Sequence, residues 1–182
     1  MKRFYKNEIA MKTYSLISVM VFLCGCISAF NSSSGQPGRY SHDHSLVKDI
    51  LEPINETRSK GMMCGNRYYK PARPVVWNDT LGQAALQHSL DMAEKGFLSH
   101  KGSDRSDPGE RLSRVGYQWV SYGENVGQGY RTAQDAVSAW LKSEIHCKNI
   151  MNPEFKEAGA SYAKSSNRRS YWTLILGNPK QQ

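Results

Sequence analysis

Apolar residues recur with a helical period in the first part of the chain, at Leu46, Ile50, Leu51 and Ile54. This spacing predicts a helix, although Pro53 counts against an unbroken one unless the helix kinks there. Gly61 ends the segment. We therefore expect ordered structure to begin near Ser45.

A second helical pattern covers about residues 80–95. Asn78 or Asp79 can cap its start, and Gly96 can end it. One face carries Leu81, Ala84, Ala85, His88 and Met92. A histidine on an apolar face is more often a core residue than a ligand, so we rank His88 second among the candidates.

A third pattern predicts a helix that runs to about Ile145. Thr132 and Asp135 form a capping box at its start, and its apolar face holds Ala136, Val137, Trp140 and Leu141. Glu144 emerges near that face at the helix end, where an isolated carboxylate needs a cation, a proton or a donor. His146 follows where the helix gives way.

The remaining segments are shorter. Residues 64–74 predict an irregular loop, residues 75–77 a short buried piece and residues 110–115 a short helix. Two strand-like runs, residues 158–163 and 171–176, would pair as a hairpin.

The first 30 residues have the layout of an export signal. Basic residues precede an apolar run that is too short for a comfortable membrane span. Met11 restarts this layout, so the start can be Met1 or Met11. We expect residues 1–30 to be a signal peptide, residues 31–44 a Ser/Gly-rich tether and residues 45–178 one domain.

Two processing routes are open for the exported chain. The segment Leu23-Cys24-Gly25-Cys26 is similar to a bacterial lipobox, in which Cys26 would become the lipidated first residue. Ordinary cleavage after Ala29 is the alternative. The first route predicts a lipid anchor in the cell envelope, and the second a periplasmic or extracellular protein.

Either route leaves Cys64 and Cys147 as the cysteines of the domain. In an oxidising compartment such a pair most simply forms one disulfide. Two buried, unpaired thiols are the alternative.

The net charge of +8 falls to +5 without residues 1–25, which hold four basic residues and one acidic residue. Arg168 and Arg169 form a basic pair, but no stripe of alternating basic and aromatic residues is visible, which argues against nucleic-acid binding. Attraction to an anionic envelope surface is a milder inference. Without a heptad seam, a monomer is the default.

Two histidines and two glutamates form the cluster with the clearest chemistry: His100, Glu124, Glu144 and His146. These groups could bind a divalent ion such as zinc, or act as general acid and base with Glu124 or Glu144 as the catalytic candidate. They could also hydrogen-bond one another as a purely structural network. The glycines around Glu124 are expected to serve tight turns.

Several ordered segments resemble the bacterial branch of the CAP superfamily, which joins cysteine-rich secretory proteins, antigen five and pathogenesis-related proteins. They are WND, QHSLDMAEKGFLSH, PGERLSRVGY, YGENVGQGY, AVSAWLKSEIHCKNIMNPEFKEAGASYA and SYW. The resemblance covers about residues 46–177, so residues 45–178 would be the CAP (SCP) domain. It implies an α+β fold, an α-β-α sandwich with a small three-stranded antiparallel sheet between helices. It also implies that the four residues form a cleft tetrad.

Two main hypotheses of function follow. The first is an exported, non-enzymatic binding module that uses the cleft for a small molecule or lipid and for a zinc ion. The second is a metal-assisted, peptidase-like hydrolase with His100 and His146 as ligands and Glu124 or Glu144 as base. A protein with an incidental cleft is the third reading. The residues favour the first, since no HExxH or GxSxG motif is present.

Overall fold

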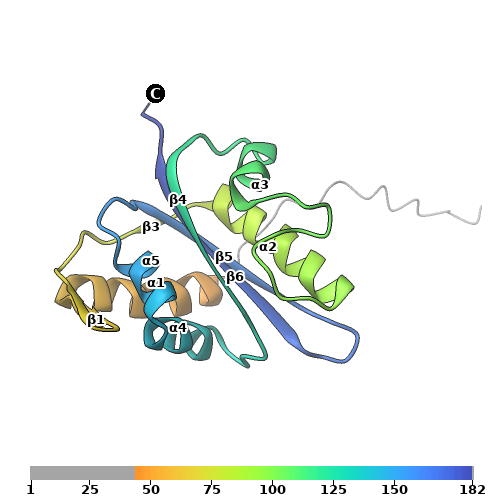
Figure 1. The fold of residues 1–182 in the computed structure, drawn as a ribbon, viewed down its shortest axis with the longest axis horizontal. Helices are drawn as coiled ribbons and strands as arrows, with labels where there is room; N and C mark the ends of the chain where they lie inside the picture. The colour runs from red at the N-terminus through yellow and green to blue at the C-terminus, as the bar shows by residue number, and fades with distance from the viewer. Residues whose placement is uncertain (1–43, 182) are drawn as a thin grey trace, which may run out of the picture. The chain divides into compact units, whose positions relative to one another are not determined.

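The structure, a computed structural model, describes residues 44–181 (Figure 1). Its elements are α1 (His44–Lys60), β1 (Met62–Cys64), β2 (Arg67–Tyr69), β3 (Val76–Trp77), α2 (Asp79–Lys95), α3 (Pro108–Arg114), β4 (Trp119–Gln128), α4 (Ala133–Lys142), α5 (Glu144–Met151), β5 (Glu157–Lys164) and β6 (Ser170–Pro179). The expected signal peptide, Cys26 and the tether up to residue 43 lie outside the described residues. Within them, no helix is long and apolar enough to cross a membrane.

Four strands form one sheet in the order β3-β5-β6-β4. β6 pairs antiparallel with both β4 and β5, and the short β3 joins β5 in parallel. The predicted hairpin near the end of the chain is confirmed as β5 and β6. The expected three-stranded antiparallel sheet is present, with β3 added at one edge and β4 forming the other edge.

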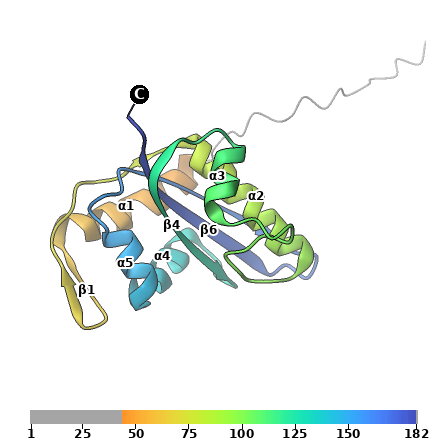
Figure 2. The same ribbon diagram turned by 45° about the horizontal axis from the view of Figure 1, so that its top comes forward.

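Helices cover both faces of this sheet (Figures 1 and 2). α1, α4 and α5 pack on one face, where Trp140 and Leu174 belong to the same core. α2 and α3 pack on the other face, where Leu81 and Leu112 meet Ile175. Neighbouring strand residues point to opposite faces, so Leu174 and Ile175 enter different cores. This confirms the α-β-α sandwich and the α+β class.

The first helix is continuous from His44 to Lys60 although Pro53 lies inside it. Gly61, which follows it, has a φ of 75°, a conformation that glycine adopts without steric penalty. The sequence therefore predicted both the helix and its end correctly.

Arg58, near the end of α1, is fully buried and cross-links three parts of the fold. Its guanidinium donates to the backbone carbonyls of Arg73, Ile150, Asn152 and Phe155 over 2.6 to 3.1 Å. Burial lowers the pKa of Arg58. These bonds join α1 to the segment before β3 and to the connection between α5 and β5.

The second helix is fixed at both ends and along its length. The side chain of Asn78 accepts from the backbone N–H groups of Thr80 and Leu81, and Gly96 ends the helix with a φ of 71°, as predicted. Gly159 of β5 allows close approach, because a Cβ there would overlap the backbone of α2. α2 is thereby held against the sheet.

The predicted helix end near Ile145 is wrong. α4 ends at Lys142, Ser143 is extended with φ −90° and ψ 124°, and α5 begins at Glu144. Serine is a preferred residue at the N-cap, the position just before a helix. Ile145 is 71% exposed, so the apolar face of α4 does not continue into the next segment. His146 lies inside α5 rather than in a fraying end.

Two further predictions need correction. The segment expected as an irregular loop from Cys64 contains the β1–β2 hairpin, which turns at Gly65 with a φ of 60°. Glu124 lies in the middle of the ten-residue β4, not between tight turns. Gly123 is needed there for room, since a Cβ would lie 2.9 Å from the ring of Phe155.

Candidate functional site

Glu124 is a buried carboxylate with two close partners. Its side chain is 2% exposed. Oε1 lies 2.8 Å from Nδ1 of His100, and Oε2 lies 2.6 Å from Nη2 of Arg111. A buried carboxylate is tolerated when it is paired and hydrogen-bonded, and an arginine side chain keeps its charge. Both oxygens of Glu124 are therefore engaged.

Arg111 reaches this position because α3 starts in a defined place. A capping box fixes the start: the Asp107 side chain accepts from the N–H of Glu110, and the Glu110 side chain accepts from the N–H of Asp107. Nη1 of Arg111 donates to the carbonyls of His100 and Ser106, each over 3.0 Å. Arg111 thus holds the buried carboxylate and the loop before α3 together.

His88 lies against this pair from α2. Its Nε2 is 2.8 Å from the carbonyl oxygen of Ser99 and 4.0 Å from Oε1 of Glu124. Because a carbonyl only accepts, Nε2 carries the proton of the neutral ring. Burial is the main cause that lowers the pKa of His88; the charge of Glu124 opposes this shift, and that of Arg111 adds to it. His88 is therefore a neutral core residue that borders the site.

His100 is oriented by Glu124 and faces solvent, with a side chain that is 52% exposed. A carboxylate accepts hydrogen bonds, so Nδ1 carries the proton and Nε2 is the nitrogen left for a ligand. A histidine whose second nitrogen is fixed in this way has one tautomer and one ring orientation.

His146 comes from α5, on the other side of the edge strand β4. The pKa of His146 is lowered, mainly by partial burial and also by the charge of nearby His100. Its carbonyl accepts from Nδ2 of Asn125, whose Oδ1 accepts in turn from Asn149 over 2.8 Å. These bonds fix α5, the helix that carries His146, to β4.

Glu144 is held elsewhere. Its carboxylate lies 2.6 Å from Nζ of Lys148, and a Cβ at Gly65 would overlap it. Among residues 44–181, no hydrogen bond or ion pair joins it to the other three predicted residues. The structure therefore joins His100 to Glu124, places His146 near enough to His100 for the charge of one to affect the other, and places Glu144 against the β1–β2 hairpin.

A metal ion does not fit this arrangement. The described part of the chain contains no group of three or more His, Cys, Asp or Glu side chains that could hold one. Glu124 is bonded to Nδ1 of His100, on the opposite side of the ring from Nε2, so it cannot share an ion bound at Nε2 and two imidazoles remain as donors. Zinc sites in proteins take three or four protein ligands, so the predicted zinc ion has no complete set of ligands here.

In the part of the chain that the structure describes, no hydroxyl group is hydrogen-bonded to an imidazole. Oγ of Ser99 accepts from the backbone N–H of Lys101 over 3.0 Å, and the side chain of Ser143 makes no capping bond. Neither serine is hydrogen-bonded to a histidine ring among residues 44–181. A nucleophile activated by an adjacent base is therefore missing from the described site.

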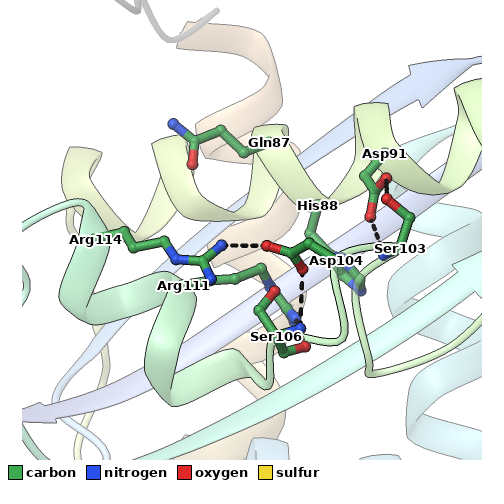
Figure 3. A pocket seen from close by; sticks show the side chains of 8 residues that line it. All are labelled: Gln87, His88, Asp91, Ser103, Asp104, Ser106, Arg111 and Arg114. Carbon is green, nitrogen blue, oxygen red and sulfur yellow. Dashed lines mark hydrogen bonds and ion pairs between the residues drawn. The ribbon is translucent and has the colours of Figure 1, made fainter.

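A polar hollow of about 220 Å³ opens between α2, α3 and the loop that joins them (Figure 3), lined by Gln87, His88, Asp91, Ser103, Asp104, Ser106, Arg111 and Arg114. Figure 3 shows Asp104 between Arg114 and Ser106, and Ser103 turned toward Asp91. Hydrogen bonds from Ser106 and Arg114 hold the pKa of Asp104 far below its usual range. These contacts anchor the loop that carries His100.

The predicted disulfide between Cys64 and Cys147 is present, with Cα atoms 5.5 Å apart. It joins β1 to α5, next to His146. The hairpin is therefore covalently linked to the helix that carries one of the two imidazoles.

Sequence reasoning missed Arg111 and Asn149. Arg111 had one indirect signal: a glutamate in a buried strand needs a cation, and Arg111 follows the start of the short predicted helix. Asn149 had none, because its role depends on the break between α4 and α5.

Comparison with known proteins shows which family and which proteins the chain is similar to. The profile of the cysteine-rich secretory protein family (CAP) matches residues 51–176. The uncharacterized protein YkwD of Bacillus subtilis is 29% identical over 143 residues, which are 79% of this chain and 50% of YkwD. The uncharacterized membrane protein YlbC of the same organism is 30% identical over 112 residues, 62% of this chain and 30% of YlbC. The chain thus spans half or less of these relatives.

Solved structures share the fold. An outer surface protein of Borrelia burgdorferi superposes with a TM-score of 0.65 and 18% identity over 77% of this chain and 97% of that one. An extracellular SCP-domain protein of Bacillus anthracis gives a TM-score of 0.61 and 23% identity over 74% of this chain and 40% of that one. At these identities the likeness concerns the fold alone.

Proposed function

The chain belongs to the cysteine-rich secretory protein (CAP) family, and from this premise we propose that it is an exported, non-enzymatic binding domain of the cell envelope. Its ligand contacts the face formed by His100 and His146. The ligand is a small molecule or lipid with a polar head and an apolar part.

The observation that carries this proposal is the double pairing of Glu124. With Arg111 on one oxygen and His100 on the other, Glu124 orients a histidine instead of taking a proton from a substrate. The side chain that meets a ligand is then His100, through Nε2. His146 stands nearby as a second polar contact.

Ile145 supports an amphiphilic ligand. It precedes His146 in α5 and is 71% exposed, so an exposed apolar side chain starts one helix position, about 100° around the axis, from the imidazole. A polar head on the imidazoles would place an attached chain within reach of Ile145. Covering an exposed isoleucine is favourable in proportion to the apolar area removed from water.

One sequence prediction and two observations support export. The predicted signal peptide at residues 1–30, the disulfide and the surface or extracellular description of the two structural relatives agree with one another. Lipid attachment at Cys26 is the anchored form of this proposal, and cleavage after Ala29 is the free form.

Binding can be tested with octanoate below its micelle concentration as the probe. We expect the ring resonances of His100 and His146 to shift in NMR spectra. Ile145→Ser should weaken the affinity by about five- to tenfold, from the loss of roughly 1 kcal/mol of apolar contact. Val120→Ser is the matched control, since Val120 is 60% exposed and lies at the start of β4. Unmoved imidazoles, or equal weakening by both variants, would refute the proposal.

One observation favours the hydrolase alternative: a histidine oriented by a carboxylate is also the arrangement of a general base. In that form His100, and not Glu124 or Glu144, would be the base. Peptidase and esterase assays, each with and without a chelator, test it. Turnover that His100→Ala removes would replace the binding proposal with an enzyme.

A further inference from the structure

The turn from β5 to β6 lies at the end of the sheet away from the C-terminus (Figure 1). A basic hollow opens beside this turn. Its volume is about 300 Å³, and it is lined by Gly129, Tyr130, Arg131, Lys164, Arg168, Arg169 and Ser170. The connection from β4 to α4 forms one wall, and the turn from β5 to β6 forms the other. No residue of the histidine face lines it.

Backbone contacts fix the wall between β4 and α4. Gly129 has a φ of 84° and donates its N–H to the carbonyl of Ser170 over 2.8 Å. The carbonyl of Tyr130 accepts from Oγ of Ser170 over 2.5 Å and from Nε1 of Trp172 over 2.9 Å. Arg131 therefore extends from an anchored backbone.

The opposite wall is also built. Ser165 accepts from the N–H of Arg168, and its own N–H donates to the carbonyl of Arg169. Arg168 has a φ of 64°, which is uncommon for a residue other than glycine. This left-handed residue turns the chain so that Arg168 and Arg169 both line the hollow.

The charges of the hollow are not compensated. Its lining holds four cations and no carboxylate, and within residues 44–181 none of the four takes part in an ion pair. Arg111 and Arg114, by contrast, each have an acidic partner. Like charges gathered without a counter-charge raise the local potential and attract anions.

We propose that this hollow binds a phosphate group, independently of the histidine face. Three guanidinium groups suit a tetrahedral oxyanion, because each can donate two parallel N–H bonds to it. Lys164 adds a point charge. Tyr162 lies two residues before Lys164 on β5, is 41% exposed and stacks on Trp172. The phosphate can belong to a lipid headgroup or be free in solution.

The test compares two triple variants of the full domain. Arg131→Gln/Arg168→Asn/Arg169→Gln removes three charges from the hollow, with asparagine at the left-handed position. Lys95→Gln/Lys142→Gln/Lys180→Gln removes three exposed charges elsewhere and is the matched control. Equal thermal midpoints of both variants and the wild type show that the fold is intact. If the midpoint of the hollow variant is lowered, the single variant Arg169→Gln takes its place in the binding test.

Two probes distinguish the sources of phosphate. Inorganic phosphate is followed by NMR at the amides of Gly129 and Ser170, and phosphatidylglycerol vesicles by co-sedimentation against phosphatidylcholine vesicles. We expect the hollow variant to lower the affinity for at least one of these probes tenfold or more. The affinities of the control variant should stay within threefold of the wild-type values. Response to phosphate alone identifies a free anion, and response to vesicles alone identifies a headgroup. Equal losses in both variants, or no response to either probe, overturn the proposal.

Discussion

Glu124 is a single buried residue whose two hydrogen-bond partners determine how the site is arranged. Its carboxylate sits in a strand between two helices, and it is tolerated there because Arg111 and His100 meet its two oxygens. The same pairing connects Glu124 to the ring of His100. In the function that we propose, a residue that looks like a ligand or base in the sequence is therefore a positioning residue.

Arg111→Met should lower the free energy of unfolding by about 3–5 kcal/mol, because it leaves a buried carboxylate without its cation. Denaturant unfolding measures this. Arg114→Met is the control in the same helix. Its ion pair with Asp104 is exposed, so the unfolding midpoint should hardly move. Equal losses from the two variants would contradict the role of Arg111.

Stability should fall as the pH drops below about 6.5. The pKa values of His88 and His146 are lowered in the folded protein from a usual 6.5. Below that pH the unfolded chain therefore binds protons that the folded chain does not, and folding loses free energy. Above it, this contribution is fully present.

Thermal midpoints at pH 7.5, 6.5 and 5.5 measure this decline. In His88→Gln the decline should be smaller, since one of the two shifted groups is gone. A variant curve parallel to that of the wild type would show that His88 titrates normally in the folded protein.

The sequence was informative about residues that carry recognisable motifs. His100 and Glu124 were found in FLSH and YGEN, and they meet. Arg111 escaped because its one signal, a buried glutamate that needs a cation, depends on the strand β4, which was not predicted. Glu144 was placed in the cluster by the resemblance and by its expected position at a helix end; its carboxylate lies against Lys148 and Gly65.

Helices were predicted correctly where a few neighbouring residues in the sequence determine their ends. α2 has an asparagine cap and a terminal glycine, and both ends agree with the prediction. The break at Ser143 was missed because helical periodicity survives a short interruption. β3 has two residues, too few for a pattern to reveal that it joins the sheet.

The disulfide is the element that holds α5 beside β1. Its cysteines are 83 residues apart, for which the chain-entropy model gives about 4–5 kcal/mol. Cys64→Ala/Cys147→Ala should lose up to this free energy of unfolding. In the still-folded variant, amide exchange should rise more in α5 than in α2. Unchanged exchange in α5 would show that the hydrogen bonds to β4 hold the helix without the disulfide.

For the described domain as a whole, Arg58 connects regions that sequence distance separates. It carries a charge, yet its acceptors are four backbone carbonyls from the segment before β3 and from the region around the end of α5. No sequence pattern marks such a residue. The sandwich itself was predicted through the resemblance of many ordered segments, and its layers agree with that expectation.

Arg58→Met should therefore destabilise the domain by about 3–5 kcal/mol, since it leaves buried carbonyls without donors. Denaturant unfolding again measures the loss. Arg73→Met is the control, because only the backbone carbonyl of Arg73 takes part and its side chain is exposed. Wild-type stability of Arg58→Met would mean that the carbonyls find other donors.

The tautomers of His100 and His88 show whether Glu124 orients His100. Long-range ¹H–¹⁵N NMR spectra of the neutral rings distinguish a proton on Nδ1 from one on Nε2. The structure predicts Nδ1–H for His100, bonded to Glu124, and Nε2–H for His88, bonded to the carbonyl of Ser99. His100 protonated on Nε2, in the same spectrum, would contradict the account.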